Sequence, residues 1–93
     1  MNEKSAYSSA ILLVFLRNIG KSCNSITQVM DLADKQLEKL GIKNTLSEST
    51  KYSTVKELID SGILISRTRT KGKKQSVSLS KKVEDYFVGE NNL

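Results

Sequence analysis

The segment from Arg67 to Leu79 alternates polar or cationic residues with small and β-branched ones, and it turns at a glycine. This period of two on either side of a Lys-Gly-Lys tip predicts a β-hairpin. Seven of the 15 Lys and Arg residues lie between Arg67 and Lys82, and this segment contains no acid. The rest of the chain contains the other eight bases and all ten acids. The net charge of +5 therefore arises from the segment 67–82. Such a hairpin suits a phosphate backbone, although lysines also protect an exposed sheet edge from strand pairing.

The 93-residue length predicts one domain over residues 1–93, with residues 1–4 and 89–93 as frayed tails. The sequence has no histidine, one cysteine and no glycine-rich phosphate loop. The commonest metal ligands and general bases are thus missing, and we expect no enzyme activity, no metal and no cofactor.

The longest apolar run, residues 10–16, is shorter than the ~20 residues that span a bilayer. A soluble cytoplasmic protein without a membrane partner is expected, with Cys23 as a small hydrophobic residue.

Three segments ahead of the hairpin repeat apolar residues with a helical period. They predict helices over residues 5–18, 25–40 and 47–60, opened by Ser or Asn caps and closed near a glycine. Residues 20–24 are expected to form a loop, and a short helix is expected from residue 81. The residues expected to face the core from the third helix and the hairpin strands 63–70 and 75–80 are Tyr52, Val55, Leu58, Ile59, Ile63, Ile65, Val77 and Leu79.

The first predicted helix is apolar almost all the way round. A helix of this kind needs burial on more than one side. The core of a small domain can cover one face, and a second copy of the chain is the simplest cover for the other. A central helix enclosed by its own chain is the alternative. For the homodimer, the expected interface residues are Ile11, Leu12, Phe15 and Leu16.

The polar side of the third predicted helix is rich in short hydroxyls and lysines. Hydroxyls are weak helix formers, but they let a helix approach another surface closely and exchange hydrogen bonds with phosphates and base edges. An ordinary solvated face is the alternative for this helix alone. The neighbouring cationic hairpin favours a nucleic-acid surface.

The order of three helices, strand, basic turn, strand and helix is that of a winged helix-turn-helix. Residues 52–65, YSTVKELIDSGILI, resemble the recognition helix and first wing strand of MarR-type and especially PadR-type regulators. Residues 67–80 resemble their wing, which closes with Leu-Ser. The resemblance covers residues 6–88 and implies an α+β, mainly helical fold with three helices, a two-stranded wing and a short C-terminal helix. One departure is that the long C-terminal dimerisation helix of these regulators is missing after Phe87.

The resemblance implies a dimeric binder of double-stranded DNA, with the third helix in the major groove and the wing at the backbone or minor groove. Three groups of residues match the DNA-contacting positions of the family. On the recognition helix they are Ser47, Ser49, Thr50, Lys51, Ser53, Thr54 and Lys56. In the preceding loop they are Lys43, Asn44 and Thr45, and in the wing, residues 67–74, they are Arg67, Arg69, Lys71, Lys73 and Lys74.

The expected role is that of a nucleoid-associated transcriptional regulator, most simply a repressor that occupies a promoter. The chain also resembles the small PadR-like centromere-binding adaptors of archaeal plasmid segregation systems, which spread on DNA and work with a segregation-protein partner. An alternative of another class is a winged helix that binds protein instead of DNA. In that case the mixed-charge face of the second helix would meet the partner.

Overall fold

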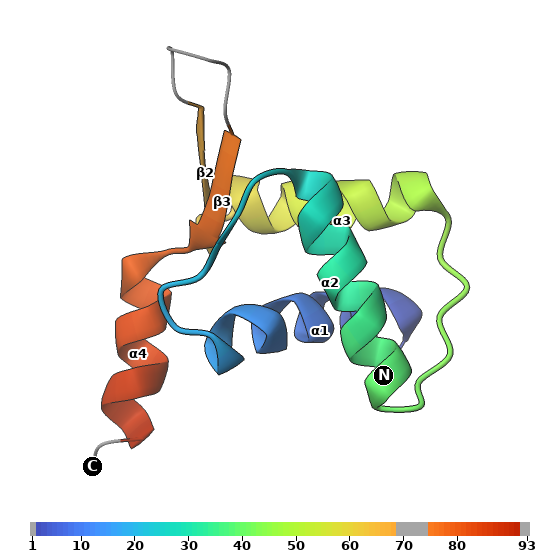
Figure 1. The fold of residues 1–93 in the computed structure, drawn as a ribbon, viewed down its shortest axis with the longest axis horizontal. Coiled ribbons are helices and arrows are strands. Elements are labelled where there is room, and N and C mark those ends of the chain that lie inside the picture. Colours follow the sequence, from blue (N-terminus) through green and yellow to red (C-terminus); the bar gives the residue numbers. More distant parts are fainter. Residues whose placement is uncertain (1, 69–74, 92–93) are drawn as a thin grey trace.

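The protein is described here by a computed structural model, which describes residues 2–68 and 75–91 (Figure 1). Four helices pack beside a small antiparallel sheet with the strand order β1-β3-β2. The helices are α1 (Glu3–Arg17), α2 (Ile26–Lys39), α3 (Glu48–Asp60) and α4 (Lys81–Asn91). The strands are β1 (Ser22–Cys23), β2 (Leu64–Thr68) and β3 (Gln75–Leu79). The α+β, mainly helical class is confirmed, and this arrangement is compatible with a winged helix.

Both ends of the described chain are more regular than predicted. Asn2, not Ser5, caps α1, because the Asn2 side chain accepts a hydrogen bond from the Ser5 backbone N–H at 2.7 Å. Lys4 makes a 2.9 Å ion pair with Glu57 of α3. At the other end, α4 continues to Asn91. Residues 2–4 and 89–91, which were expected in frayed tails, thus cap a helix or lie within one. Residues 1, 92 and 93 lie outside the described residues.

The ends of α2 and α3 follow the predicted local chemistry. The Ser25 hydroxyl accepts from the Gln28 N–H at 3.0 Å, and the Ser47 hydroxyl caps α3 in the same way. Gly41 and Gly62 follow the two helices with φ of 70° and 84°. A Cβ atom is strained in this left-handed region, so a glycine there ends a helix at little cost.

The sheet has a third strand that the sequence did not predict. Ser22 and Cys23 lie in the expected loop but pair with Ser78 and Val77 of β3. Two residues are too few to display a period, so this strand leaves no pattern in the sequence. It buries Cys23, whose thiol pKa is raised by burial, in agreement with its interpretation as a small hydrophobic residue.

In the first wing strand, the residues that face the core differ by one position from those predicted. Leu64, rather than Ile63 or Ile65, is fully buried and pairs with Leu79 of β3. The Ile63 N–H still bonds to the Leu58 carbonyl at the end of α3, so alternation begins only after Ile63. Because side chains alternate between faces, this shift exchanges the inward and outward residues of the strand. The isoleucines are half-buried instead.

The core surrounds α1, which contacts α2, α3 and β3. Ile11 and Phe15 are both fully buried inside the single chain. Their assignment to a dimer interface is therefore wrong, because the helix is largely enclosed by its own domain. Leu12 and Leu16 are half-buried against the core, and Leu13 is exposed.

Candidate nucleic-acid interface

The surface that could meet DNA consists of α3 and the hairpin that follows it. In Figure 1 the strands β2 and β3 project from the helical body near the C-terminal end of α3. A turn at residues 61–63 joins the helix to β2. This short connection fixes the base of the hairpin next to the helix.

One strip of α3 is exposed along its length. Ser49, Tyr52, Ser53 and Lys56 are exposed and follow the spacing i, i+3, i+4, i+7, which places them on one face. Tyr52 was predicted to be buried, but 47% of its surface is accessible. The correction adds an aromatic side chain with a hydroxyl to the candidate site. Its spacing from Ser49 and Lys56 could have identified it, but its apolar ring favoured the core assignment.

Hydroxyl bonds fix the first turns of α3. The Ser47 hydroxyl lies 2.9 Å from the Thr50 hydroxyl and 3.2 Å from that of Ser49. The Ser53 hydroxyl donates to the Thr50 carbonyl at 3.0 Å. These bonds satisfy a backbone N–H at the start of the helix and the Thr50 carbonyl. The Ser53 hydroxyl, which donates in its bond, can still accept a further hydrogen bond. Ser47 is exposed and Thr50 is half-buried.

Thr54 does not belong to the exposed strip. Its side chain is buried and its hydroxyl donates to the Thr50 carbonyl at 2.7 Å. It lies beside Val55 and Leu58, which form the inward side of α3. The prediction that Thr54 faces a DNA groove is therefore wrong, because this position points into the domain.

Lys51 is committed to a contact within the protein. Its ammonium lies 3.1 Å from the Asp34 carboxylate of α2, and its side chain is only 16% exposed. The same ammonium lies 5.7 Å from the ring centre of Tyr7. Burial, and then the nearby Asp34 charge, raise the pKa of Tyr7, whose hydroxyl donates to the Met30 carbonyl. Lys51, which was predicted to contact DNA, therefore ties α3 to α2 in this structure.

The loop before α3 is also held by internal bonds. The Asn44 side chain donates to the Glu3 carbonyl at 3.2 Å and accepts from the Leu46 N–H at 3.0 Å. The Thr45 hydroxyl lies 2.8 Å from one Glu3 carboxylate oxygen and 2.9 Å from the other. Asn44 and Thr45, which were predicted to contact DNA, therefore hold the loop against the start of α1 in this structure. Lys43 is exposed and stays a candidate.

The wing is described only at its base. Arg67 is exposed on β2 opposite Ser76, and Thr68 pairs with Gln75. The predicted contacts Arg69, Lys71, Lys73 and Lys74 lie outside the described residues. Their charge matters because α3 itself carries three acids and two lysines. The helix therefore carries one more acid than base, and the neighbouring segment 67–74 carries five cations.

Neither a metal nor a membrane is indicated by the described parts of the chain. Within residues 2–68 and 75–91, no group of three His, Cys, Asp or Glu residues could hold a metal ion. Over the same residues, none of the helices combines the length and the apolar character that crossing a bilayer requires.

A comparison with protein-family models finds no match to this chain, and a search of curated proteins finds none that is significantly similar. Its function must therefore be inferred from its own surface.

The two lysines of α3 should respond differently to substitution. We expect Lys51→Ala to lower the free energy of unfolding by about 1 kcal/mol, because it removes a cation–π contact and an ion pair in which the lysine, though not Asp34, is largely shielded from water. Lys56→Ala, on the exposed strip, should change it by less than about 0.5 kcal/mol. Urea denaturation measures both. Equal effects would contradict the assignment of Lys51 to the interior.

Proposed function

We propose that the chain is a winged helix-turn-helix protein that binds double-stranded DNA and regulates transcription by occupying its site. The observation that carries this proposal is the exposed polar strip of α3 beside the base of a hairpin whose residues 67–74 include five cations. The strip would enter the major groove, and the wing would follow the adjacent phosphate backbone.

The dimensions and chemistry of the strip support this assignment. An α-helix with its side chains is about 10–12 Å across and fits the roughly 12 Å major groove. The serines are short enough for close approach and can donate to or accept from base edges. Lys56 adds one cation at the end of the strip nearer the wing. The strip would supply sequence preference, and the wing would supply general affinity.

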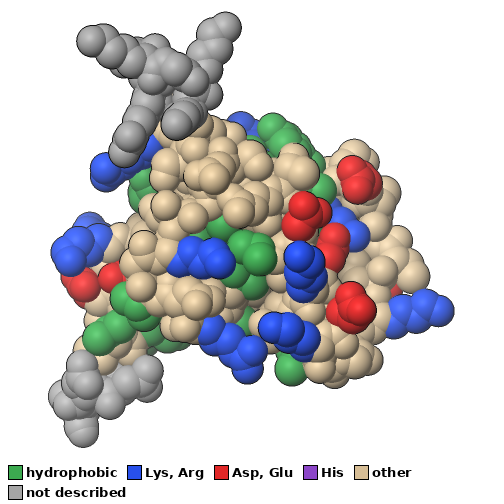
Figure 2. Space-filling model, in the orientation of Figure 1, with side chains coloured by type: hydrophobic (Ala, Val, Ile, Leu, Met, Phe, Trp, Pro, Cys, Tyr) green, Lys and Arg blue, Asp and Glu red, His purple; other side chains and the backbone are tan. Residues whose placement is uncertain are grey.

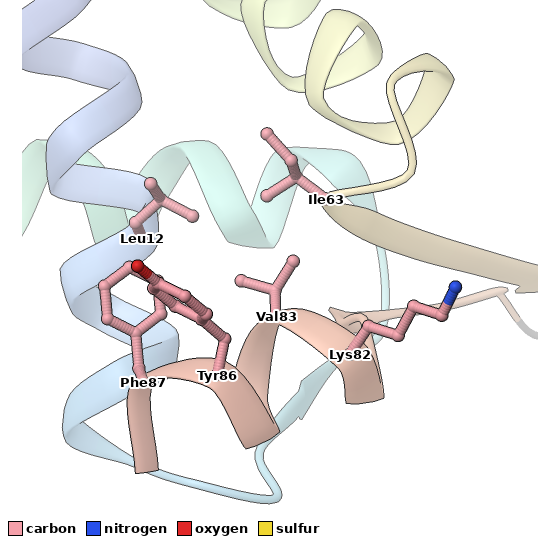
Figure 3. A pocket seen from close by; sticks show the side chains of 6 residues that line it. All are labelled: Leu12, Ile63, Lys82, Val83, Tyr86 and Phe87. Carbon is pink, nitrogen blue, oxygen red and sulfur yellow. The ribbon is translucent and has the colours of Figure 1, made fainter. Parts of the chain in front are cut away.

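An apolar groove supports dimerisation. A groove of about 340 Å³ is lined by Leu12 of α1, Ile63 before β2, and Lys82, Val83, Tyr86 and Phe87 of α4 (Figure 3). The rings of Tyr86 and Phe87 meet edge to face at 5.4 Å. Tyr86 is 63% exposed, and Leu13, Phe87 and Val88 are also accessible.

We propose that a second copy of the chain covers this groove. A protein that exposes several large apolar side chains in one area gains free energy when a partner removes them from water. A twofold arrangement through α1 and α4 would present two copies of α3 to two half-sites. Of the four residues predicted for the interface, Leu12 lines the groove and Leu16 is half-buried nearby on the same helix.

Selection of bound fragments from random DNA, followed by footprinting, tests the proposed function. Two protected half-sites in an inverted repeat would support a regulator that binds as a dimer. Protection that grows outward from one site would instead favour a segregation adaptor that spreads on DNA. Absence of any footprint at low salt would contradict DNA binding.

The exposed strip should carry the sequence preference. Ser49→Ala and Ser53→Ala should each weaken binding to the selected site by about 1–3 kcal/mol if the hydroxyl reaches a base edge. Binding to random DNA should hardly change. Thr27→Ala, which removes an exposed hydroxyl from α2, is the matched control. An equal loss on random DNA would show that these serines contact phosphates instead of bases.

The wing should supply affinity with little sequence preference. Replacing Lys73 and Lys74 together with alanine should weaken binding to all sequences alike. The slope of log K against log salt should flatten by about one to two units for each wing, because fewer counterions are released. Lys35→Ala with Lys39→Ala, on α2, removes the same charge as a control. An unchanged slope in the wing variant would show that these lysines do not touch DNA.

The groove variant Phe87→Glu should separate the two copies. A carboxylate buried in an apolar interface costs several kcal/mol, while the same group is hydrated on a free monomer. We expect a chain that stays folded by circular dichroism, sediments as a monomer and binds an inverted repeat more weakly. Ile42→Glu places the same charge on an exposed apolar residue in the loop before α3 and should leave the dimer intact. A monomeric unmodified chain would refute the dimer.

A further inference from the structure

A second pocket is lined by cations and lies away from the proposed DNA surface. It has a volume of about 220 Å³ and lies between the C-terminal end of α1 and the second half of α2. Its lining residues include four cations, two polar residues and two apolar ones: Arg17, Lys21, Lys35, Lys39, Asn18, Gln36, Val14 and Leu32. No acid is among these described lining residues. Glu38 adjoins a separate depression that shares Lys35 and Lys39.

Gln36 is the unusual residue of this pocket. Its side chain is buried, with only 6% of the residue exposed, and its Oε1 accepts a hydrogen bond from the Arg17 guanidinium at 3.3 Å. Its Nε2 is buried and donates to no atom of the part of the chain that the structure describes. The opposite amide orientation would place two donors against each other, so the bond to Arg17 fixes the assignment.

A buried amide donor without an acceptor is unfavourable and uncommon. Here it occurs in a pocket whose described lining brings together four cations, each costly to crowd without a counter-charge, and no acid. An anion would remove both costs, because its oxygens accept hydrogen bonds and its charge offsets the cations. The two features are independent, since one is a missing acceptor and the other an excess of positive charge.

We propose that this pocket binds a small phosphorylated molecule. A phosphate group carries up to two negative charges and three acceptor oxygens, which suits several donors converging on one place. The planar guanidinium of Arg17 pairs well with phosphate oxygens, and the lysines supply point charges around it. The Gln36 amide would donate the remaining hydrogen bond. The apolar side chains of Val14 and Leu32 would contact the uncharged part of the ligand.

The position of the pocket favours a small molecule over the DNA backbone. Figure 2 shows several Lys and Arg side chains low on this face of the molecule, where Figure 1 places α1 and the end of α2. The pocket lies at the α1–α2 contact, while the exposed strip of α3 points away from the domain. None of the residues of the exposed strip is among those that line the pocket.

Calorimetric titration of the full chain with pyrophosphate tests the proposal, with ionic strength held constant by chloride. We expect saturable binding at one site per chain. Lys35→Gln with Lys39→Gln, which leaves the Arg17–Gln36 bond in place, should weaken it by about tenfold or more. Lys73→Gln with Lys74→Gln removes the same charge from the wing and should change it by less than about twofold. Backbone amide NMR shifts should centre on Arg17, Lys21 and Gln36.

Two results would overturn the proposal. If both double variants bound pyrophosphate equally weakly, or if the heat of binding did not saturate, pyrophosphate would only be screening the general positive charge. Loss of DNA affinity in the Lys35/Lys39 variant, measured without pyrophosphate, would mean that the pocket holds a backbone phosphate instead of a small molecule. Circular dichroism of each variant confirms that it is folded before either result is interpreted. Because DNA binding is measured separately, failure of this site leaves the proposed function open to its own test.

Discussion

The enclosure of α1 is the constraint on which the rest of this structure depends. This helix carries apolar residues on opposite sides, and α2, α3 and β3 pack around it until Tyr7, Ile11 and Phe15 are fully buried. Burial of a large side chain contributes about 1.5–3 kcal/mol, so these residues anchor a domain with few aromatics. With α1 in the centre, α3 must use one side to cover it and leave the other side exposed. The candidate DNA surface is thus a consequence of how the core is closed.

Specific polar contacts then fix the orientation of α3. The Lys51–Asp34 ion pair joins it to α2, the Lys4–Glu57 pair joins it to α1, and the bonds between Thr45 and Glu3 hold the preceding loop. Several residues that resemble DNA contacts by position are engaged in this way. In a domain of this size, polar residues near a binding surface have to serve the packing of the helix as well as its ligand.

Much of the element order could be predicted from sequence because its determinants are local. Serine caps and glycines with positive φ act within one turn of a helix, and Ser25, Ser47, Gly41 and Gly62 mark the predicted boundaries. The position of the buried side of α3 was harder to predict from the sequence. A helical period gives the width of a buried stripe but not its centre. Because Tyr52 has an apolar ring, it was included in the expected stripe, whereas Thr54 is buried instead.

Long-range pairing was the other limit. Strand β1 exists because β3 offers it hydrogen bonds, and nothing in Ser22–Cys23 itself indicates a strand. The one-residue phase error at Leu64 has a similar origin, because the turn after α3 decides where alternation begins. Of the candidate site, Ser49, Ser53, Lys56 and Arg67 were named from the sequence, whereas Tyr52 was assigned to the core. The buried amide of Gln36 could not be, since a missing acceptor is a property of three-dimensional packing.

The exposed strip of α3 has a further consequence for how this surface can evolve. Ser49, Tyr52, Ser53 and Lys56 make no part of the core, whereas Thr54, Val55 and Leu58 on the opposite side do. Surface substitutions away from the core usually alter stability by less than about 0.5 kcal/mol. Mutation can therefore vary the chemistry of the strip almost independently of folding. A lineage that keeps this domain intact could explore new partners for the strip one residue at a time, without first acquiring compensating changes in its interior.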